Sequence, residues 1–344
     1  MELTRRGPGL LLRDILKGKD PQIDAVVQVL AHVAPDVVLL TGIDWDYGNH
    51  ALTALADALK TQGQPYEHLF ALRPNSGMAT TLDLDGDGRT GGPGDAQGYG
   101  RFMGHGGMAI LSKLPVMAEA AQDFSALLWT DLPNALLPEM NGTPFPSAEA
   151  IAQQRLSSVG HWAVPIQTNG GQQITLLAYA ANPPVFDGPE DRNGKRNHDE
   201  NMLWANFLNG NFPSPAPTTP VILLGNANLD PVDGDGLHDA INTLRAHPRL
   251  QDPQPRSTGG AEAAKTQAGA NENHIGDPAL DTADWRDIGG PGNLRVSYVL
   301  PDSALSVIAS GIFWPMPDAP LFDLLTGEDA PRHHLVWVDI EPDS

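Results

Sequence analysis

The sequence of 344 residues contains no cysteine and no long hydrophobic run. Without cysteine the chain forms no disulfide, thiolate zinc site or iron–sulfur cluster, and it has no cysteine nucleophile. A helix that spans a bilayer needs about 18 or more consecutive apolar residues, and no stretch of the sequence reaches that length. We therefore expect no membrane-embedded segment and no thiol chemistry.

Positive charge is also scarce. Lys and Arg number 21 against 42 Asp and Glu, which gives a formal net charge of -21 at pH 7. Such a surface repels phosphate backbones, so we expect no binding to bulk nucleic acid, although a nuclease that recruits metal ions stays open. Residues 1–6 lack the hydrophobic region of a signal peptide, which leaves two expectations for localisation: a cytoplasmic protein, or the mature form of an exported one.

Apolar residues occur both at helical spacing and in short continuous runs. The helical spacing predicts helices at 10–15, 23–33, 51–59 and 199–208. The runs predict strands at 37–40, 108–111, 162–166, 174–180, 221–224, 294–300, 307–312 and 335–340. Long loops at 83–107 and 248–293 interrupt this pattern. Interleaved strands and helices predict one α/β domain over 1–344, with a mixed sheet or a pair of sheets.

A polar cluster follows the most apolar of these strands. Residues 221–224 are Val-Ile-Leu-Leu, and Asn226 and Asn228 come directly after them. The carboxyl end of a core strand is where α/β proteins place functional groups, and alternation puts both amides on one side. A turn closed by Asx hydrogen bonds explains the same residues equally well.

Five segments resemble, in chain order, those of the endonuclease/exonuclease/phosphatase superfamily, the DNase I-like metal-dependent phosphoesterases. They are residues 35–40, 107–113, 221–228, 295–300 and 332–336. The third resembles a strand that ends in Gly-Asp-x-Asn, and the fourth resembles Arg-x-Asp-Tyr-x-Leu. The resemblance implies a four-layer α/β/β/α sandwich of two mixed sheets. It also implies hydrolysis of a small phosphoester with a divalent ion, Mg²⁺ or Mn²⁺, in the cleft.

The chain departs from the family pattern at the positions that carry its chemistry. The Glu that ends the second strand of the family is Gly42 here, and the Asp of Gly-Asp-x-Asn is Asn226. Ser297 replaces the Asp of Arg-x-Asp-Tyr, and Arg332 replaces the acidic residue before the closing His. Ala180 stands where the family has a strand-end His. These replacements remove most of the negative charge that holds a divalent ion.

The family's first strand ends in a metal-shell Asn and would lie just before Glu2. Of the remaining pattern the chain keeps Asn228 and His333. The resemblance implies that His333 is the general base for water, and that Asn228 binds the phosphoryl oxygen with Asn226 beside it. Arg332 would contact an anionic substrate, but it would also repel a metal ion.

Three further residues offer replacements for the lost groups. Asp44 and Asp46 follow Gly42 at alternate positions, so either carboxylate is a candidate metal ligand. The alternative for Asp44 is a solvated carboxylate at the end of a strand. His161 begins a predicted strand and is a candidate catalytic assistant, against the simpler expectation of a buried, hydrogen-bonded imidazole.

The segment 83–88 has the sequence Asp-Leu-Asp-Gly-Asp-Gly. Carboxylates at Asp83, Asp85 and Asp87 occupy positions one, three and five of a calcium-loop pattern. Position twelve is Gly94 rather than Glu, so the segment is no complete EF-hand loop. We expect a Ca²⁺ site closed by other oxygens, with an acidic solvated turn as the alternative.

A polar segment of mixed charge, 186–200, includes Arg192. Its cations are candidates for an anion-binding surface, and we assign Arg192 to substrate binding with Arg332. A loop in which the acidic residues neutralise these cations is the alternative. Two functions therefore stay open. One is a metal-dependent phosphoester hydrolase of weak or lost activity, and the other is a non-catalytic module that binds calcium or an unknown ligand.

Overall fold

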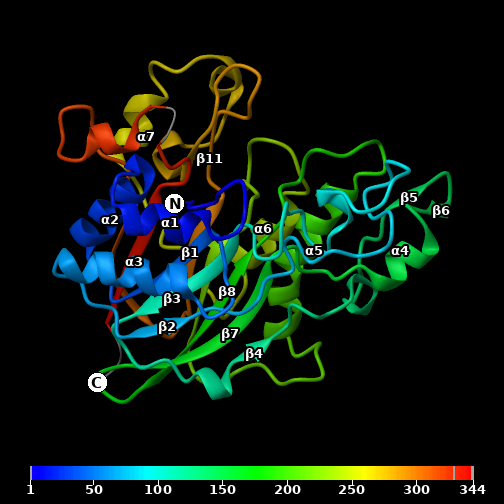
Figure 1. Ribbon diagram of the computed structural model, residues 1–344, viewed down its shortest axis with the longest axis horizontal. Coiled ribbons are helices and arrows are strands. Elements are labelled where there is room, and N and C mark those ends of the chain that lie inside the picture. Colours follow the sequence, from blue (N-terminus) through cyan, green and yellow to red (C-terminus); the bar gives the residue numbers. More distant parts are fainter. Residues whose placement is uncertain (1, 328–329, 342–344) are drawn as a thin grey trace.

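The computed structural model describes residues 2–327 and 330–341, and its elements stack in layers (Figure 1). The first layer consists of helices α1 (Leu10–Lys17), α2 (Pro21–Val33) and α3 (His50–Thr61). It packs on an antiparallel sheet in the order β1–β3–β2, with β1 (Val37–Ile43), β2 (His68–Phe70) and β3 (Gly107–Ser112). The apolar spacing of the sequence thus predicts the cores of these elements correctly, except for the short strand β2, which it does not predict.

The second sheet has five strands in the order β12–β9–β8–β7–β4. They are β4 (Gln122–Asp123), β7 (Gly160–Gln167), β8 (Gln173–Ala180), β9 (Val221–Asn226) and β12 (Ser297–Pro301). β8 and β9 are parallel and the other neighbours antiparallel, so this sheet is mixed. Its outer face is covered by α5 (Arg192–Leu208) and α6 (Asp239–Arg245).

The remaining elements are smaller. β13 (Ser306–Phe313) and β14 (Leu335–Glu341) form an antiparallel two-stranded sheet. The other short strands and α-helices of the described chain are β5 (Glu139–Met140), β6 (Thr143–Pro144), α4 (Ala148–Gln153), α7 (Thr258–Ala263), β10 (Ala283–Asp284) and β11 (Asn293–Leu294), and short 3-10 helices lie in the loops. Among the helices of residues 2–327 and 330–341, none has the length and apolar character to cross a membrane.

Three apolar clusters lie between the layers. One, around Leu30 and Leu55, joins the first helices to β1 and β3. A second, around Ile110 and Trp162, fills the space between the two sheets. The third, around Trp204, joins the five-stranded sheet to α5 and α6. Helix, sheet, sheet and helix therefore follow one another, which confirms the predicted α/β sandwich.

Two boundaries differ from the sequence prediction. α5 begins at Arg192 rather than at 199, because its charged residues are buried and hydrogen-bonded to neighbouring loops. Arg196, for example, is 2% exposed and donates to the carbonyl oxygens of Leu156, Arg155 and Gln97. The predicted strand 294–300 is divided into β11 and β12, since the chain leaves the ladder between them.

Candidate functional site

Three polar residues meet where β9 ends and the antiparallel edge strand β12 begins. Asn226 is the last residue of β9, and it pairs across the ladder with Ser297, the first residue of β12. The Oγ of Ser297 lies 3.4 Å from Nδ1 of His333, which precedes β14. We call these residues, with Glu2 and Asn228, the strand-end site. The structure thus brings Asn226, Ser297 and His333 together, as their positions in the family pattern imply.

His333 is buried at this site, with 8% of its surface exposed. The ring of Trp285 meets it edge-on, with the ring centroids 5.2 Å apart. Burial lowers the pKa of His333 to about 4, although the carboxylate of Glu2 acts in the opposite direction. The imidazole is therefore neutral at pH 7 and can accept a hydrogen bond or a proton through one ring nitrogen.

Glu2 is the one site residue that the sequence analysis does not identify. Its Oε1 lies 3.7 Å from Nε2 of His333, and its Oε2 accepts a hydrogen bond of 3.1 Å from the backbone N–H of Arg332. A Cβ atom added to Gly42 would lie 3.4 Å from Cβ and Cγ of Glu2. The Glu2 side chain therefore lies directly over Gly42, the position at which the family pattern has its own Glu.

The backbone holds Glu2 in this place. Leu3 forms a parallel bridge with Ile43, and its N–H donates to the carbonyl oxygen of Gly42 at 2.8 Å. Burial raises the pKa of Glu2, but its interaction with the imidazole of His333, which strengthens when that ring is protonated at acidic pH, and backbone hydrogen bonds outweigh this effect and lower the pKa. No sequence signal pointed to Glu2, since the glycine at position 42 is accounted for by its φ of 71°, in the left-handed region that favours glycine.

Asn226 and Asn228 form a turn closed by an Asx hydrogen bond, which is one of the two structures expected from the sequence. The N–H of Asn228 donates to Oδ1 of Asn226 at 3.0 Å. The Nδ2 of Asn228 donates to the carbonyl oxygen of Ala181 at 2.6 Å, just beyond the end of β8. Asn228 has a φ of 48°, in the left-handed region that asparagine tolerates better than most residues. Both amides therefore have a structural role beside His333.

The structure does not support Asp44 and Asp46 as replacement metal ligands. The two oxygens of Asp44 accept hydrogen bonds from the backbone N–H groups of Arg5 and Gly106, at 2.7 and 2.9 Å. Burial raises its pKa to about 6, against these hydrogen bonds. Asp46 caps α3 by accepting from the N–H groups of His50 and Ala51. A β-bulge between Thr41 and Ile43 also breaks the alternation on which the prediction depended.

His161 is a buried histidine with hydrogen-bond partners in the core, which does not support its assignment as a catalytic assistant. It has no exposed surface, and both ring nitrogens have partners. Nδ1 lies 2.6 Å from Oγ of Ser157, and Nε2 lies 2.9 Å from the carbonyl oxygen of Glu200. Burial lowers its pKa to about 3. A satisfied core imidazole was the simpler expectation for this residue.

Arg192 also has a structural place, at the first turn of α5. It is 9% exposed, and its Nη2 donates to Oε1 of Gln154 at 3.1 Å. Burial lowers its pKa, opposed first by the charge of Asp85 and then by that of Asp187. Arg192 therefore faces the acidic loop around Asp85. None of its described contacts joins it to the strand-end site, which does not support its assignment to substrate binding with Arg332.

The acidic loop brings Asp83, Asp85 and Asp87 together. One carboxylate oxygen from each lies within 4.8 Å of the others. The loop is shaped by its own hydrogen bonds: Asp83 accepts from the N–H groups of Gly86 and Gly88. Burial and the neighbouring carboxylates raise the pKa of Asp85, although a backbone hydrogen bond lowers it. Within the described part of the chain, this is the only group of three or more His, Asp or Glu side chains that are close enough together to hold a metal ion.

The strand-end site does not fit the divalent ion that the family implies. Mg²⁺ and Mn²⁺ take oxygen ligands and are usually held by carboxylates. Among the contacts of the described residues, Glu2 is the one carboxylate that approaches His333. Asn226 and Ser297 offer neutral oxygens, and the oxygen of Asn226 already accepts a hydrogen bond. Such a donor set provides little of the negative charge that a divalent ion requires.

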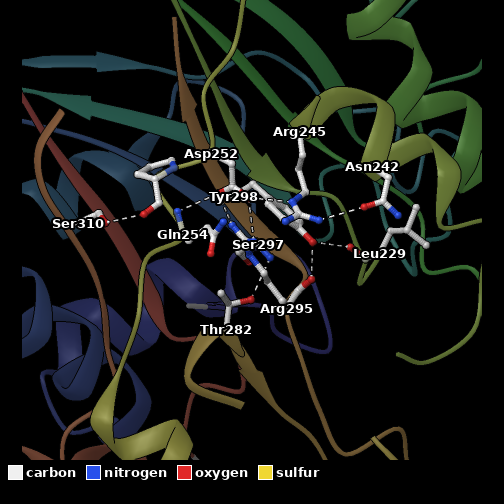
Figure 2. A network of polar contacts seen from close by, with 11 residues as sticks. Leu229, Asn242, Arg245, Asp252, Gln254, Thr282, Arg295, Ser297, Tyr298 and Ser310 are labelled. Atoms are coloured by element: carbon white, nitrogen blue, oxygen red, sulfur yellow. Dashed lines mark hydrogen bonds and ion pairs between the residues drawn. The ribbon is translucent and has the colours of Figure 1, made fainter. Parts of the chain in front are cut away.

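A second polar network lies beside this site and contains the other residues of the same motif (Figure 2). Arg295 forms a two-pronged ion pair with Asp252, with distances of 2.6 and 3.0 Å. Arg245 donates to the same carboxylate at 2.8 Å. The hydroxyl of Tyr298 lies 2.7 Å from the carbonyl oxygen of Arg295 and 3.0 Å from that of Leu229. This network joins β12 to the segments around it.

Comparisons with known proteins agree with this fold. The model of the Endonuclease/Exonuclease/phosphatase family matches residues 15–324. A search of curated proteins finds no match. Among solved structures, the endonuclease/exonuclease/phosphatase of Beutenbergia cavernae DSM 12333 is similar with a TM-score of 0.51 and 16% identity. That likeness covers 93% of this chain but 65% of the other, which is less than two thirds of its length.

Two further structures are similar at lower scores. A family protein from Leptotrichia buccalis C-1013-b has a TM-score of 0.48 and 15% identity, with 93% of this chain and 92% of that chain covered. The mannosyl-6-phosphatase Bt3783 of Bacteroides thetaiotaomicron VPI-5482 has a TM-score of 0.48 and 11% identity, with 99% and 97% covered. Identities this low concern the fold alone. Because the family model matches most of the sequence, the chain belongs to the endonuclease/exonuclease/phosphatase family.

Proposed function

We propose that this chain is a family member that has lost efficient metal-dependent phosphoester hydrolysis and acts as a non-catalytic binding protein. One observation carries the proposal: Asn226 and Ser297 lie at the paired ends of β9 and β12, where the family resemblance implies aspartates. Glu2 is left as the one carboxylate in contact with His333 among the described residues. A neutral amide and a hydroxyl cannot supply the missing charge.

The polar groups of the site suit a small ligand that both accepts and donates hydrogen bonds. His333 offers a neutral imidazole, and Glu2 offers a carboxylate at its side. Arg332 adds a positive charge next to them in the sequence, which suits an anionic group such as a phosphoester. Binding of this kind does not require a resident metal ion.

The direct test is an activity assay. The purified protein and a His333→Ala variant would be incubated with bis-p-nitrophenyl phosphate and p-nitrophenyl phosphate in Mg²⁺, Mn²⁺ and Ca²⁺ in turn. We expect no release of p-nitrophenol above the level of the variant with any ion. Turnover that disappears in the His333→Ala variant would establish a working hydrolase and overturn the proposal.

A gain-of-function variant tests the cause. Asn226→Asp combined with Ser297→Asp restores two carboxylates next to Glu2, and we expect Mn²⁺ to bind this double variant measurably by calorimetry. The matched control is Asn169→Asp with Ser303→Asp, which adds the same two charges at exposed positions. If the parent protein binds Mn²⁺ as tightly as the double variant, then the loss of carboxylates has not weakened the site.

A second candidate function is calcium binding at the acidic loop. It is favoured by the three carboxylate oxygens of Asp83, Asp85 and Asp87, which lie within 4.8 Å of one another. Ligands that bind the folded state raise the melting temperature, so we expect Ca²⁺ to raise Tm in the parent and not in an Asp85→Asn variant. Asp235→Asn removes an exposed carboxylate elsewhere and serves as the control. An Asp85→Asn protein that responds as fully as the parent would exclude this site.

A further inference from the structure

The loop that follows β10 places a tryptophan against the strand-end site. The ring of Trp285 stands at 88° to the ring of His333, with the two centroids 5.2 Å apart. Perpendicular rings do not stack, so at least one face of the indole is not covered by the imidazole. Trp285 packs beside the small apolar cluster around Leu294 but stays partly exposed, so its ring is within reach of a ligand.

The backbone holds this tryptophan in place. The N–H of Trp285 donates to the carbonyl oxygen of Gly292 at 3.3 Å, and the N–H of Asp284 donates to that of Arg332 at 2.9 Å. Both bonds attach the loop to segments that it meets in the fold. A side chain that is fixed before a ligand arrives loses less entropy on binding. The indole is therefore a preformed wall of the strand-end site.

The same pairing divides the neighbouring side chains between two faces. Ala283 lies opposite His333 in an antiparallel bridge, and alternation places Trp285 on the face that these two share. Arg332 lies on the other face, opposite Asp284. Burial raises the pKa of Asp284, and the charge of Arg332 is among the effects that lower it. The positive charge of Arg332 therefore belongs to the face away from Trp285.

The groups beside Trp285 are hydrogen-bond acceptors. When Nδ1 of His333 carries its proton towards Oγ of Ser297, 3.4 Å away, the neutral imidazole offers an acceptor at Nε2. Oε1 of Glu2 lies 3.7 Å from Nε2, which is beyond hydrogen-bond distance. The Glu2 side chain is 26% exposed. Two acceptors, one of them charged, thus stand side by side next to an aromatic ring.

The chemistry of a guanidinium group matches these features. It is planar and positively charged, its N–H groups bond adjacent acceptors in one plane, and its face stacks on aromatic rings. An ammonium group has the same charge but no flat face. A divalent metal ion requires more oxygen ligands than this face presents. The net charge of -21 also favours a cationic ligand over an anionic one.

We propose that the strand-end site binds a guanidinium group, which lies flat on the indole of Trp285 and donates hydrogen bonds to Glu2 and His333. The group belongs to a small guanidino compound or to an arginine side chain of a peptide, since both present the same chemistry. The inference rests on the proposed binding function and deepens it by naming the group that is bound. Trp285 is the residue that distinguishes a planar cation from other cations.

Calorimetry on the full chain, at constant ionic strength and with EDTA, tests the proposal. We expect the parent to bind methylguanidinium about fivefold more tightly than methylammonium. Trp285→Leu is expected to remove this preference, and Trp285→Phe, which keeps an aromatic ring, to retain most of it. Glu2→Gln is expected to weaken the binding of both cations about tenfold. Asp235→Asn removes an exposed carboxylate elsewhere and is expected to change neither affinity.

A third probe separates the two sources of the group. N-acetylarginine methylamide that binds more tightly than methylguanidinium supports an arginine side chain of a peptide, and weaker binding supports a small guanidino compound. Equal affinity of the parent for methylguanidinium and methylammonium would overturn the inference. A guanidinium preference that persists in Trp285→Leu, or binding that is unchanged in Glu2→Gln, would place the cation elsewhere and overturn it as well.

Methylphosphonate, an anion that a phosphoesterase cannot hydrolyse, separates failure of this inference from failure of the proposed function. If the parent binds methylphosphonate but neither cation, the inference is wrong and the binding function stands. If the parent binds none of these probes, both are wrong. Turnover of p-nitrophenyl phosphate that disappears in His333→Ala would overturn the loss of catalysis, whereas a guanidinium preference that depends on Trp285 would still support the inference.

Discussion

Strand β12 and the residues just before it contribute side chains to two regions with different surroundings. Arg295 and Tyr298 take part in the polar network of Figure 2, in which every charged group has a partner. Ser297 lies between them in the sequence and belongs to the strand-end site, where neutral residues occupy the positions of acids. The comparison indicates that Arg295 and Tyr298 stabilise the fold, whereas Ser297 between them contacts the imidazole of the strand-end site.

Burial explains the difference. The side chain of Arg295 is 4% exposed and that of Asp252 is 9% exposed, so either charge alone would be costly. Burial raises the pKa of Asp252, but the hydrogen bonds and charges of Arg295 and Arg245 outweigh this effect and lower it. Ser297 and Asn226 are only partly buried, and neither side chain carries a charge. We therefore expect substitutions at these two positions to cost less stability than substitutions in the network.

The largest effect is expected from breaking the network. Arg295→Met leaves the buried carboxylate of Asp252 with Arg245 as its remaining partner, and removal of one partner of a buried ion pair costs about 3–5 kcal/mol. Urea unfolding would measure this loss. Arg256→Met is the control, because Arg256 pairs with Asp277 at the surface and such pairs contribute about 0–1 kcal/mol. Equal losses in the two variants would contradict the comparison.

A smaller effect is expected from Asp281. It precedes Thr282, whose hydroxyl accepts hydrogen bonds from the backbone N–H groups of Val296 and Ser297. Burial and the charges of Asp230, Asp233 and Asp277 raise the pKa of Asp281 to about 8. The folded state therefore holds a proton that the unfolded state releases at lower pH. Stability decreases as the pH rises from about 4 to about 8, and it is lowest above the folded-state pKa.

Asp281→Asn removes this loss of stability, because the amide carries no charge at any of these pH values. We expect the variant to be about 2 kcal/mol more stable than the parent at pH 8.5, with the difference vanishing towards pH 4. Urea unfolding at several pH values would show the trend, and Asp235→Asn at an exposed position serves as the control. A difference that does not change with pH would mean that Asp281 is not protonated in the folded protein.

The predictable part of the fold is the part recorded in local apolar spacing. The run at 221–224 predicts β9, and the spacing at 23–33 predicts α2, because these patterns depend on one buried face. The beginning of α5 at Arg192 was not predictable in this way. Its first turns are polar, and Arg196 becomes buried only when three carbonyl oxygens of distant loops come together around it.

The candidate site was likewise predictable only where the sequence pattern records it. The meeting of Asn226, Ser297 and His333 was predictable from their order in the family pattern. The position of Glu2 was not, because it depends on a single bridge between Leu3 and Ile43. Asp44 has the residue type and spacing of a ligand, but backbone N–H groups of two loops already bind its oxygens. Sequence shows which groups are available, and only the structure shows which of them are already engaged.

The smallest expected effects separate two neighbours on β12. Tyr298→Phe removes the hydroxyl that lies near two buried carbonyl oxygens, and an unsatisfied buried group costs about 1–3 kcal/mol. Ser297→Ala removes a hydroxyl whose nearest partner is 3.4 Å away, and we expect a change within about 0.5 kcal/mol. Both would be measured by urea unfolding at pH 7. If Ser297→Ala costs as much as Tyr298→Phe, then the strand-end site also stabilises the fold, and its neutral residues would be there for stability rather than through loss of catalysis.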